Sequence, residues 1–131
     1  MRTIVKAGLG CALALGLWAA SAEEYHDRPY PIEHAAHPLR FGVYQCFGPR
    51  AAIVPSFALL DAGTYRDGDG GTGAYTYNTA DGMMQMTSGG LEGVSYWREK
   101  ELSFRPLRSG GNFMPFECVL NPAMDANAPP W

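Results

Sequence analysis

Short apolar segments separated by turn-forming residues are the feature that most limits how this chain can fold. Between residues 40 and 120, the aromatic, β-branched and other apolar residues come in short runs, and clusters of Gly, Asp and Pro interrupt each run. Such runs favour strands of roughly 4–8 residues over helices of 10 or more. The expected strands are 40–47, 56–60, 64–66, 73–78, 83–88, 93–97, 101–107 and 113–120.

The segments between these strands carry the residues that tight turns require. The strongest turn signals are Asp61-Ala62-Gly63, Asp67-Gly68-Asp69-Gly70-Gly71, Asp81-Gly82, Gly89-Gly90 and Gly110-Gly111. Asp accepts hydrogen bonds within turns, and Gly adopts positive φ without steric cost. The sequence therefore predicts an all-β domain, a small antiparallel meander of about seven to eight strands, closed as a barrel or folded as a sandwich, with extended N- and C-terminal arms.

Two of the three cysteines, Cys46 and Cys118, lie near the two ends of the predicted β-domain. The third, Cys11, lies in the N-terminal apolar run and should be removed with a signal peptide, which leaves two cysteines. An even number of cysteines in an oxidising compartment favours a disulfide bond, and no Cys-x-x-Cys spacing indicates a redox or metal site. The first and last strands of an up-and-down barrel are neighbours. A bond between Cys46 and Cys118 therefore favours closure of the sheet.

The first 22 residues have the pattern of a secretory signal. Arg2 and Lys6 precede an apolar run from 7 to 20, and Ala20-Ser21-Ala22 is a small-x-small cleavage site. The run is about 14 residues long, shorter than the roughly 20 that span a bilayer. We expect a cleaved signal peptide, a periplasmic or secreted protein, and no transmembrane segment after cleavage.

The remaining chain divides into an arm, a β-domain and a tail. Residues 23–39 hold three prolines and all three histidines, and residues 121–131 are again rich in proline. Prolines at this density favour extended chain, so we expect an extended arm at 23–39, a β-domain at 40–120 and a Pro-rich tail at 121–131. Both faces of the first strand are apolar, so we expect the arms or a partner protein to cover its outer face.

The charge of the chain excludes one class of partner. Removing Arg2 and Lys6 from the ten basic residues leaves eight against thirteen acidic residues, a formal charge near −5 in place of −3. An acidic chain without a Lys/Arg cluster lacks the basic surface that binds phosphates. We therefore expect no nucleic-acid partner.

The candidate metal ligands are the histidines of the arm and two aspartates. His26, His34 and His37 offer imidazoles that suit zinc or copper, but not in the His-Glu-x-x-His order of zinc hydrolases. Asp67 and Asp69 offer paired carboxylates without the remaining ligands of a calcium-binding loop. The alternative for the histidines is a polar arm without a metal ion, and the alternative for the two aspartates is a hairpin turn. No cofactor is expected.

Several aromatic residues are candidates for a ligand or partner face. Aromatic rings with polar tips suit sugars and protein interfaces, but they also stabilise cross-strand pairs in any sheet. Met84 and Met86 would share a strand face with such residues or fill the core. The candidate face consists of Tyr65, Tyr75, Tyr77, Tyr96 and Trp97.

The sequence offers little for catalysis. No serine lies in a Gly-x-Ser-x-Gly elbow, and every histidine precedes the strands that would hold a rigid site. We therefore do not expect an enzyme.

Five segments give the chain a resemblance to a known class of proteins. They are Tyr44-Gln45-Cys46, Gly63-Thr64-Tyr65-Arg66, Gly73-Ala74-Tyr75-Thr76-Tyr77, Ser88-Gly89-Gly90-Leu91 and Cys118. In this order they resemble small exported bacterial β-domain proteins of uncharacterised function, and more distantly lipocalin- or avidin-like barrels. The resemblance implies a compact β-domain with a disulfide between its first and last strands, and it implies no activity, catalytic residue or cofactor.

The expected function is that of a non-enzymatic exported binding or assembly module, such as an accessory subunit of a periplasmic or envelope complex with a protein partner. The alternatives are a small-ligand-binding barrel, with the ligand among Tyr75, Tyr77, Met84, Met86 and Trp97, and a metal-binding protein that uses the arm histidines.

Overall fold

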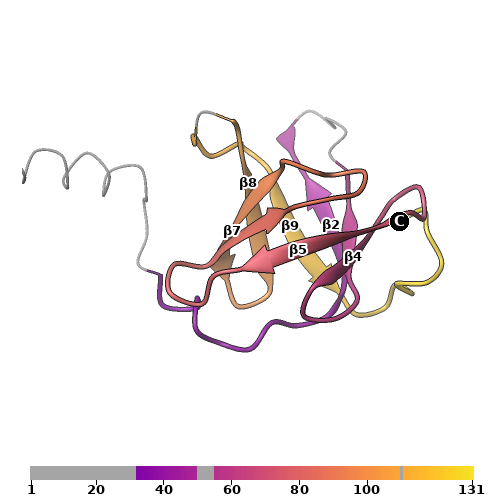
Figure 1. Ribbon diagram of the computed structural model, residues 1–131, viewed down its shortest axis with the longest axis horizontal. Helices are drawn as coiled ribbons and strands as arrows, with labels where there is room; N and C mark the ends of the chain where they lie inside the picture. The colour runs from indigo at the N-terminus through magenta and orange to yellow at the C-terminus, as the bar shows by residue number, and fades with distance from the viewer. Residues whose placement is uncertain (1–31, 50–54, 110) are drawn as a thin grey trace, which may run out of the picture. The chain divides into compact units, whose positions relative to one another are not determined.

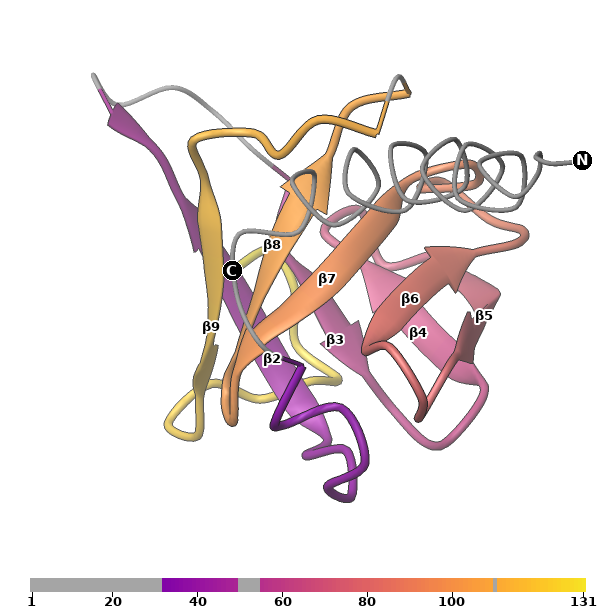
Figure 2. The same cartoon turned by 90° about the vertical axis from the view of Figure 1, so that its left-hand side faces the viewer.

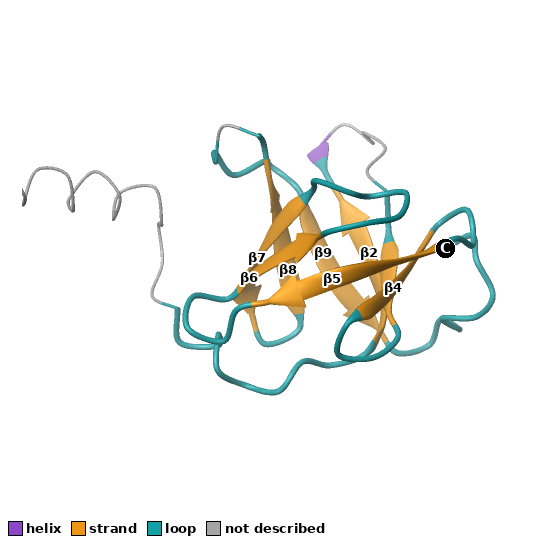
Figure 3. Ribbon diagram, in the orientation of Figure 1, coloured by secondary structure: helices purple, strands orange, loops and turns teal. Residues whose placement is uncertain are grey.

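Eight antiparallel strands follow one another around a closed barrel in the order of the sequence (Figures 1 and 3). The computed structural model describes residues 32–49, 55–109 and 111–131, so the predicted signal peptide at 1–22, residues 23–31 of the arm and His26 lie outside it. No helix in the described part is long and apolar enough to cross a membrane. The strands are β2 Gly42–Phe47, β3 Phe57–Leu59, β4 Thr64–Asp67, β5 Thr72–Tyr77, β6 Met83–Met86, β7 Ser95–Lys100, β8 Ser103–Leu107 and β9 Glu117–Asn121.

Pairing of the first and last described strands closes the barrel. β2 runs antiparallel to β9 from Val43 opposite Asn121 to Phe47 opposite Glu117, and Cys46 lies directly opposite Cys118. These two cysteines form a disulfide bond. Closure removes the unpaired strand edges that an open sheet would expose. Of the two predicted architectures the barrel is thus confirmed, together with the disulfide.

The strand bounds differ from the expected ones mainly in the strands that come last in the sequence. β7 continues to Lys100, and the next turn is formed by residues 101–102. β9 begins at Glu117 rather than near Phe113, because Pro115 has no N–H to donate to a strand ladder. Phe113 instead forms an isolated antiparallel bridge with Leu107 of β8.

Large side chains fill the interior of the barrel. Alternate positions on the strands point inward, and an eight-stranded barrel is just wide enough for its own side chains to fill. Phe57 is central to this packing, with its ring centroid 4.8 Å from that of Tyr96 and 5.5 Å from that of Tyr44. The core residues are Tyr44, Phe57, Leu59, Tyr65, Tyr75, Met84, Met86, Leu91, Tyr96, Phe104 and Cys118.

The two ends of the barrel are built from different segments. Because the strands alternate in direction, the β3–β4, β5–β6 and β7–β8 turns share one end with residues 32–41, and we call this the arm end. The β2–β3, β4–β5, β6–β7 and β8–β9 connections lie at the other end, which we call the mouth. Figure 2 shows the indigo arm segment at one end of the barrel and the orange β8–β9 loop at the other.

The C-terminal tail runs from the arm end back along the outside of the barrel (Figure 1). Nη2 of Arg66 on β4 lies 3.5 Å from Oδ1 of Asn127, which ties the tail to this strand. Pro130 and Trp131 then border a hollow with Asp67 beside the β4–β5 turn. The described part of the tail therefore lies on the barrel of its own chain.

Gly89 shows why the β6–β7 loop requires glycine. Its φ of +87° is in the left-handed region, and a Cβ atom there would lie 2.7 Å from the Tyr65 hydroxyl. This close approach allows the Tyr65 hydroxyl to donate to Ser88 O and to accept from the Leu91 N–H, at 2.7 and 2.9 Å. The loop is thereby held over the core, with Leu91 buried beneath it.

Loss of the disulfide is expected to destabilise the barrel. The bond joins residues 72 apart in the sequence. In the chain-entropy description, a cross-link over about 70 residues lowers the entropy of the unfolded chain and so stabilises the folded state by about 4 kcal/mol. The Cys46→Ser/Cys118→Ser variant should lose up to this much of its free energy of unfolding, measured by urea denaturation. Dithiothreitol should destabilise the native protein similarly and leave the double variant unchanged. Equal stability of the oxidised protein and the double variant would contradict this expectation.

Candidate functional site

The candidate aromatic face lies mostly inside the protein. Tyr65, Tyr75, Tyr96 and Trp97 are each at most 4% exposed, and only Tyr77 is partly buried. Trp97 is on the outer side of the barrel, where its ring centroid lies 5.3 Å from that of Phe113 and its Nε1 donates to Asp81 O at 3.1 Å. These aromatic residues therefore pack the fold, although Tyr96 also borders an open cleft and Tyr77 borders a smaller hollow.

Hydroxyl groups of the core tyrosines hold loops against the barrel. Tyr44 donates to Arg40 O at 2.6 Å, Tyr77 donates to Ala35 O at 2.5 Å, and Tyr75 donates to Asp61 O. Burial raises the pKa of Tyr44 to about 12, and burial also raises the pKa values of Tyr75 and Tyr96. These phenols stay protonated at neutral pH, so the hydroxyl groups of Tyr44 and Tyr75 remain hydrogen-bond donors to the loops.

A cleft of about 720 Å³ opens to solvent at the mouth of the barrel. We call it the mouth cleft. Its floor includes Leu91, Tyr96 and Pro106, and its walls include Val94 and Met114. Gln85, Glu92, Leu107 and Arg108 also line it. An apolar floor with a few polar groups is typical of binding sites, and mouths of β-barrels are a common place for them.

Backbone hydrogen bonds fix both walls of the mouth cleft. In the β6–β7 loop, Met86 N–H donates to Val94 O at 3.0 Å and Gly93 N–H donates to Met86 O at 2.8 Å. In the β8–β9 loop, Met114 N–H donates to Pro106 O at 2.9 Å. The cleft is therefore formed before any ligand arrives, which lowers the ordering cost of binding.

A bidentate ion pair supports the wall at Met114. Arg105 Nη2 lies 2.8 and 2.9 Å from the two carboxylate oxygens of Glu99, and Arg105 Nη1 donates to Met114 O at 3.3 Å. The Glu99 side chain is only 9% exposed. A fork-like pair of this kind orients the guanidinium, which in turn positions the loop backbone.

Arg98 closes the opposite, arm end of the barrel. This arginine of β7 is 2% exposed, on a strand face shared with Tyr96. Its Nη1 donates to His34 O at 3.2 Å and His37 O at 2.6 Å, and its Nη2 donates to Pro38 O at 3.0 Å and Glu101 O at 2.9 Å. A buried guanidinium needs such partners to offset the loss of water. The described part of the arm is thus bound to its own barrel.

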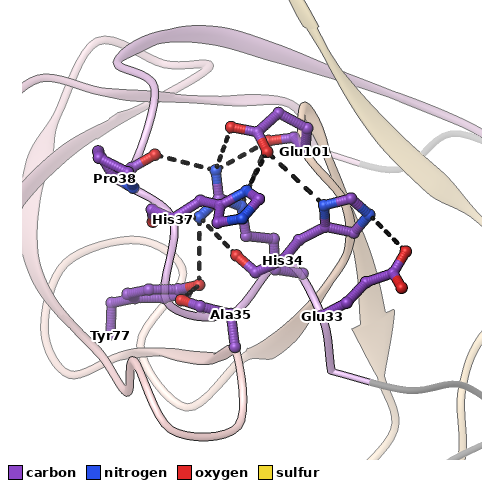
Figure 4. A network of polar contacts seen from close by, with 8 residues as sticks. Glu33, His34, Ala35, His37, Pro38, Tyr77 and Glu101 are labelled. Carbon is purple, nitrogen blue, oxygen red and sulfur yellow. Dashed lines mark hydrogen bonds and ion pairs between the residues drawn. The ribbon is translucent and has the colours of Figure 1, made fainter.

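Arg98 donates to the backbone of both described histidines. Figure 4 shows the side chains of His34 and His37 beside the carboxylate of Glu101, which belongs to the β7–β8 turn. Nδ1 of His37 lies 2.5 Å from Oε1 of Glu101, and Nδ1 of His34 lies 3.6 Å from the same oxygen. The hydrogen bond from His37 is the main cause that lowers the pKa of Glu101, followed by the nearby charges of His37, Arg98 and His34, against an opposing effect of burial. Glu101 is thus an anion at neutral pH. We call His34, His37 and Glu101 the arm cluster.

The other candidate ligands have different surroundings. Oδ1 of Asp67 accepts the N–H groups of Asp69 and Gly71 at 2.9 and 3.1 Å, as an aspartate does in a hairpin turn. Among the described residues, the arm cluster is the one group of three or more His, Cys, Asp or Glu residues whose ligand atoms lie close enough together for a metal ion. Asp67 and Asp69 do not belong to it.

Sequence reasoning did not single out Arg98, Glu101 or the mouth cleft. Arg98 follows Tyr96 at an inward-facing strand position, and a charged residue at such a position signals a buried polar role. Glu101 has no local signal, because the arm brings histidines 64 and 67 residues earlier in the chain beside it. The mouth cleft depends on the path of two loops.

Comparisons with protein-family models, with curated proteins and with solved structures found no match to this chain. The resemblance to small exported β-domain proteins therefore stays a prediction.

Replacement of Arg98 should release the arm and weaken the fold. Arg98→Met keeps an unbranched apolar chain but removes the guanidinium, so the carbonyl groups of His34, His37, Pro38 and Glu101 lose their donor. Each buried acceptor left unpaired costs about 1–3 kcal/mol, so we expect a loss of about 3 kcal/mol or more in urea denaturation. Hydrogen exchange at residues 33–39 should become faster.

The matched control is Arg108→Met, since Arg108 is an exposed arginine at the mouth. A surface change of this kind should alter stability by about 0.5 kcal/mol or less. If Arg98→Met were no less stable than Arg108→Met, Arg98 would not be what holds the arm.

Proposed function

We propose that this protein is an exported, non-enzymatic binding module, such as an accessory subunit of a periplasmic or envelope complex, that holds a partner protein in the mouth cleft. The observation that carries the proposal is a preformed cleft of about 720 Å³ outside a barrel whose interior is filled. Export is supported by the signal-like pattern of residues 1–22 and is compatible with the Cys46–Cys118 disulfide.

The filled interior favours a protein partner over an enclosed small ligand. Barrels that carry small molecules surround most of the ligand, and pockets for them commonly bury 70–90% of the ligand surface. Here Met84, Met86, Phe57 and Phe104 occupy the interior at 0% exposure. The remaining cleft is open to solvent, so a ligand there would stay partly exposed. A partner protein brings its own surface to cover the opening.

The closed barrel limits how that partner can bind. Addition of a strand to a sheet edge needs a free edge, and β2 pairs with both β3 and β9. We therefore expect the partner to be recognised mainly through side chains. The apolar floor suits an aliphatic or aromatic side chain, while Glu92 and Arg108 offer one charge of each sign at the polar rim.

The lining of the mouth cleft supports binding more than catalysis. Its described lining residues include one carboxylate, Glu92, and one guanidinium, Arg108, but neither a histidine nor a cysteine. General acid–base or nucleophilic catalysis needs a positioned pair of such groups. The two described histidines lie in the arm cluster at the opposite end of the barrel.

Photo-crosslinking from the mouth cleft tests the proposal. A photoreactive residue in place of the exposed Gln85 should capture one stoichiometric partner protein in the native cell envelope, identified by mass spectrometry. Leu107→Asn, which places an amide on the apolar lining, should reduce the yield of this product about tenfold or more, since an unmatched polar group costs roughly 1–3 kcal/mol.

The matched control is Leu102→Asn, because Leu102 is a partly exposed leucine in the β7–β8 turn at the arm end. It should leave the crosslink unchanged, and thermal melting should show that both variants fold. Three outcomes would refute the proposal: no captured protein, equal loss in both leucine variants, or a small molecule in native mass spectrometry that Leu107→Asn displaces.

A further inference from the structure

We propose that His34, His37 and Glu101 form an exchangeable binding site for a divalent transition-metal ion, Zn²⁺ or Cu²⁺, at the arm end of the barrel. This site is separate from the mouth cleft, and the proposal does not depend on the function of that cleft.

The spacing of the donor atoms suits one ion. One nitrogen from each histidine and one oxygen of Glu101 lie within 4.8 Å of one another. With bonds of about 2.0–2.2 Å, neighbouring donors around a tetrahedral zinc ion are about 3.3–3.5 Å apart. The 3.6 Å between His34 Nδ1 and Glu101 Oε1 is close to this value. The 2.5 Å between His37 Nδ1 and Glu101 Oε1 must widen when an ion takes the place of the shared proton.

Nδ1 of His34 is a buried nitrogen without a hydrogen-bond partner. Its 3.6 Å separation from Glu101 is too long for a hydrogen bond. An unpaired buried polar atom is costly and rare, and a missing ion is one of the ordinary reasons for it. A metal ion between His34 and Glu101 would use this lone pair.

Glu33 prepares His34 for this role. Oε1 of Glu33 lies 3.3 Å from Nε2 of His34, on the far side of the ring from Glu101 (Figure 4). A carboxylate at this position favours a proton on Nε2 and leaves the lone pair on Nδ1. Metal-binding histidines commonly have such a carboxylate partner, which fixes the ring and makes the other nitrogen more basic.

Arg98 fixes the backbone that carries the ligands. It donates to the carbonyl oxygens of His34, His37 and Glu101, so all three ligand residues are held by one buried side chain. Its positive charge opposes a cation, but the carboxylates of Glu33 and Glu101 together exceed it. Nη2 of Arg98 lies 3.5 Å from Oε2 of Glu101, the oxygen that does not face the histidines. Oε1 is thus left for the ion.

The exposure and chemistry of the ligands select the kind of ion. The side chains of His37 and Glu101 are 50% and 41% exposed, so water can complete the coordination sphere and the ion can leave. Two imidazoles and a carboxylate, with no thiolate, suit Zn²⁺ and Cu²⁺ better than Ca²⁺ or Mg²⁺. Cu²⁺ should bind more tightly than Zn²⁺, as it does at most such sites.

Titration of the metal-free exported protein, purified without a polyhistidine tag, tests the site. We expect one equivalent of Cu²⁺ and one of Zn²⁺ in separate calorimetric titrations, and imidazole nitrogen couplings in the electron paramagnetic resonance spectrum of the Cu²⁺ form. Glu33→Gln should weaken binding about tenfold or more, as loss of a carboxylate behind a ligating histidine does. His34→Gln, His37→Gln and Glu101→Gln should each weaken it further.

The matched control is His26→Gln, which removes a histidine of the same arm that lies outside the described residues and that the proposed site does not use. It should leave the affinity unchanged. Melting curves should show that all variants fold, and metal should raise the melting temperature of the native protein but not of His34→Gln/His37→Gln. Absence of binding, undiminished binding by that double variant, or loss of binding in His26→Gln would overturn the proposal.

Discussion

The pairing of β2 with β9 is the constraint on which the rest of this structure depends. It converts a linear meander into a closed barrel, so that each described strand pairs with a strand on either side. The Cys46–Cys118 disulfide lies within this pairing. Closure also fixes the interior volume, which eight strands leave just large enough for their own side chains. Here Phe57, Met84, Met86 and Phe104 fill that interior, so the outer surface and the two ends are what remains accessible to other molecules.

The two ends of the barrel are covered by different kinds of contact. At the arm end a buried arginine, Arg98, faces the carbonyl groups of the arm, and its hydrogen bonds seal the end with polar contacts. At the mouth, the β6–β7 loop places Leu91 over the core, and the β8–β9 loop leaves an apolar cleft beside it. The polar end accordingly carries the proposed ion site, and the apolar end carries the proposed partner site.

Arg98 connects the fold to the proposed metal site. Its hydrogen bonds to the carbonyl oxygens of His34, His37 and Glu101 hold both histidine backbones against the β7–β8 turn, beside the direct contact between the His37 and Glu101 side chains. An ion bound by His34, His37 and Glu101 would strengthen the connection between the same two segments. The arm would then be held by the buried guanidinium of Arg98 and by an exchangeable metal ion at the surface. Metal binding would therefore change the stability of this end of the barrel and not the mouth cleft.

The sequence by itself determined the strand–turn pattern, the all-β class and the pairing of Cys46 with Cys118, because these follow from local periodicity, turn chemistry and the number of cysteines. It also named His34 and His37 as candidate ligands, together with His26, Asp67 and Asp69, but not Glu101. The tertiary structure alone decided for a barrel over a sandwich, since strand order does not fix whether the last strand returns to the first. It alone decided that the aromatic residues fill the core, that Arg98 binds the arm, and that a cleft opens at the mouth. Each of these depends on residues far apart in the sequence, whose contacts leave no periodic signal in the chain.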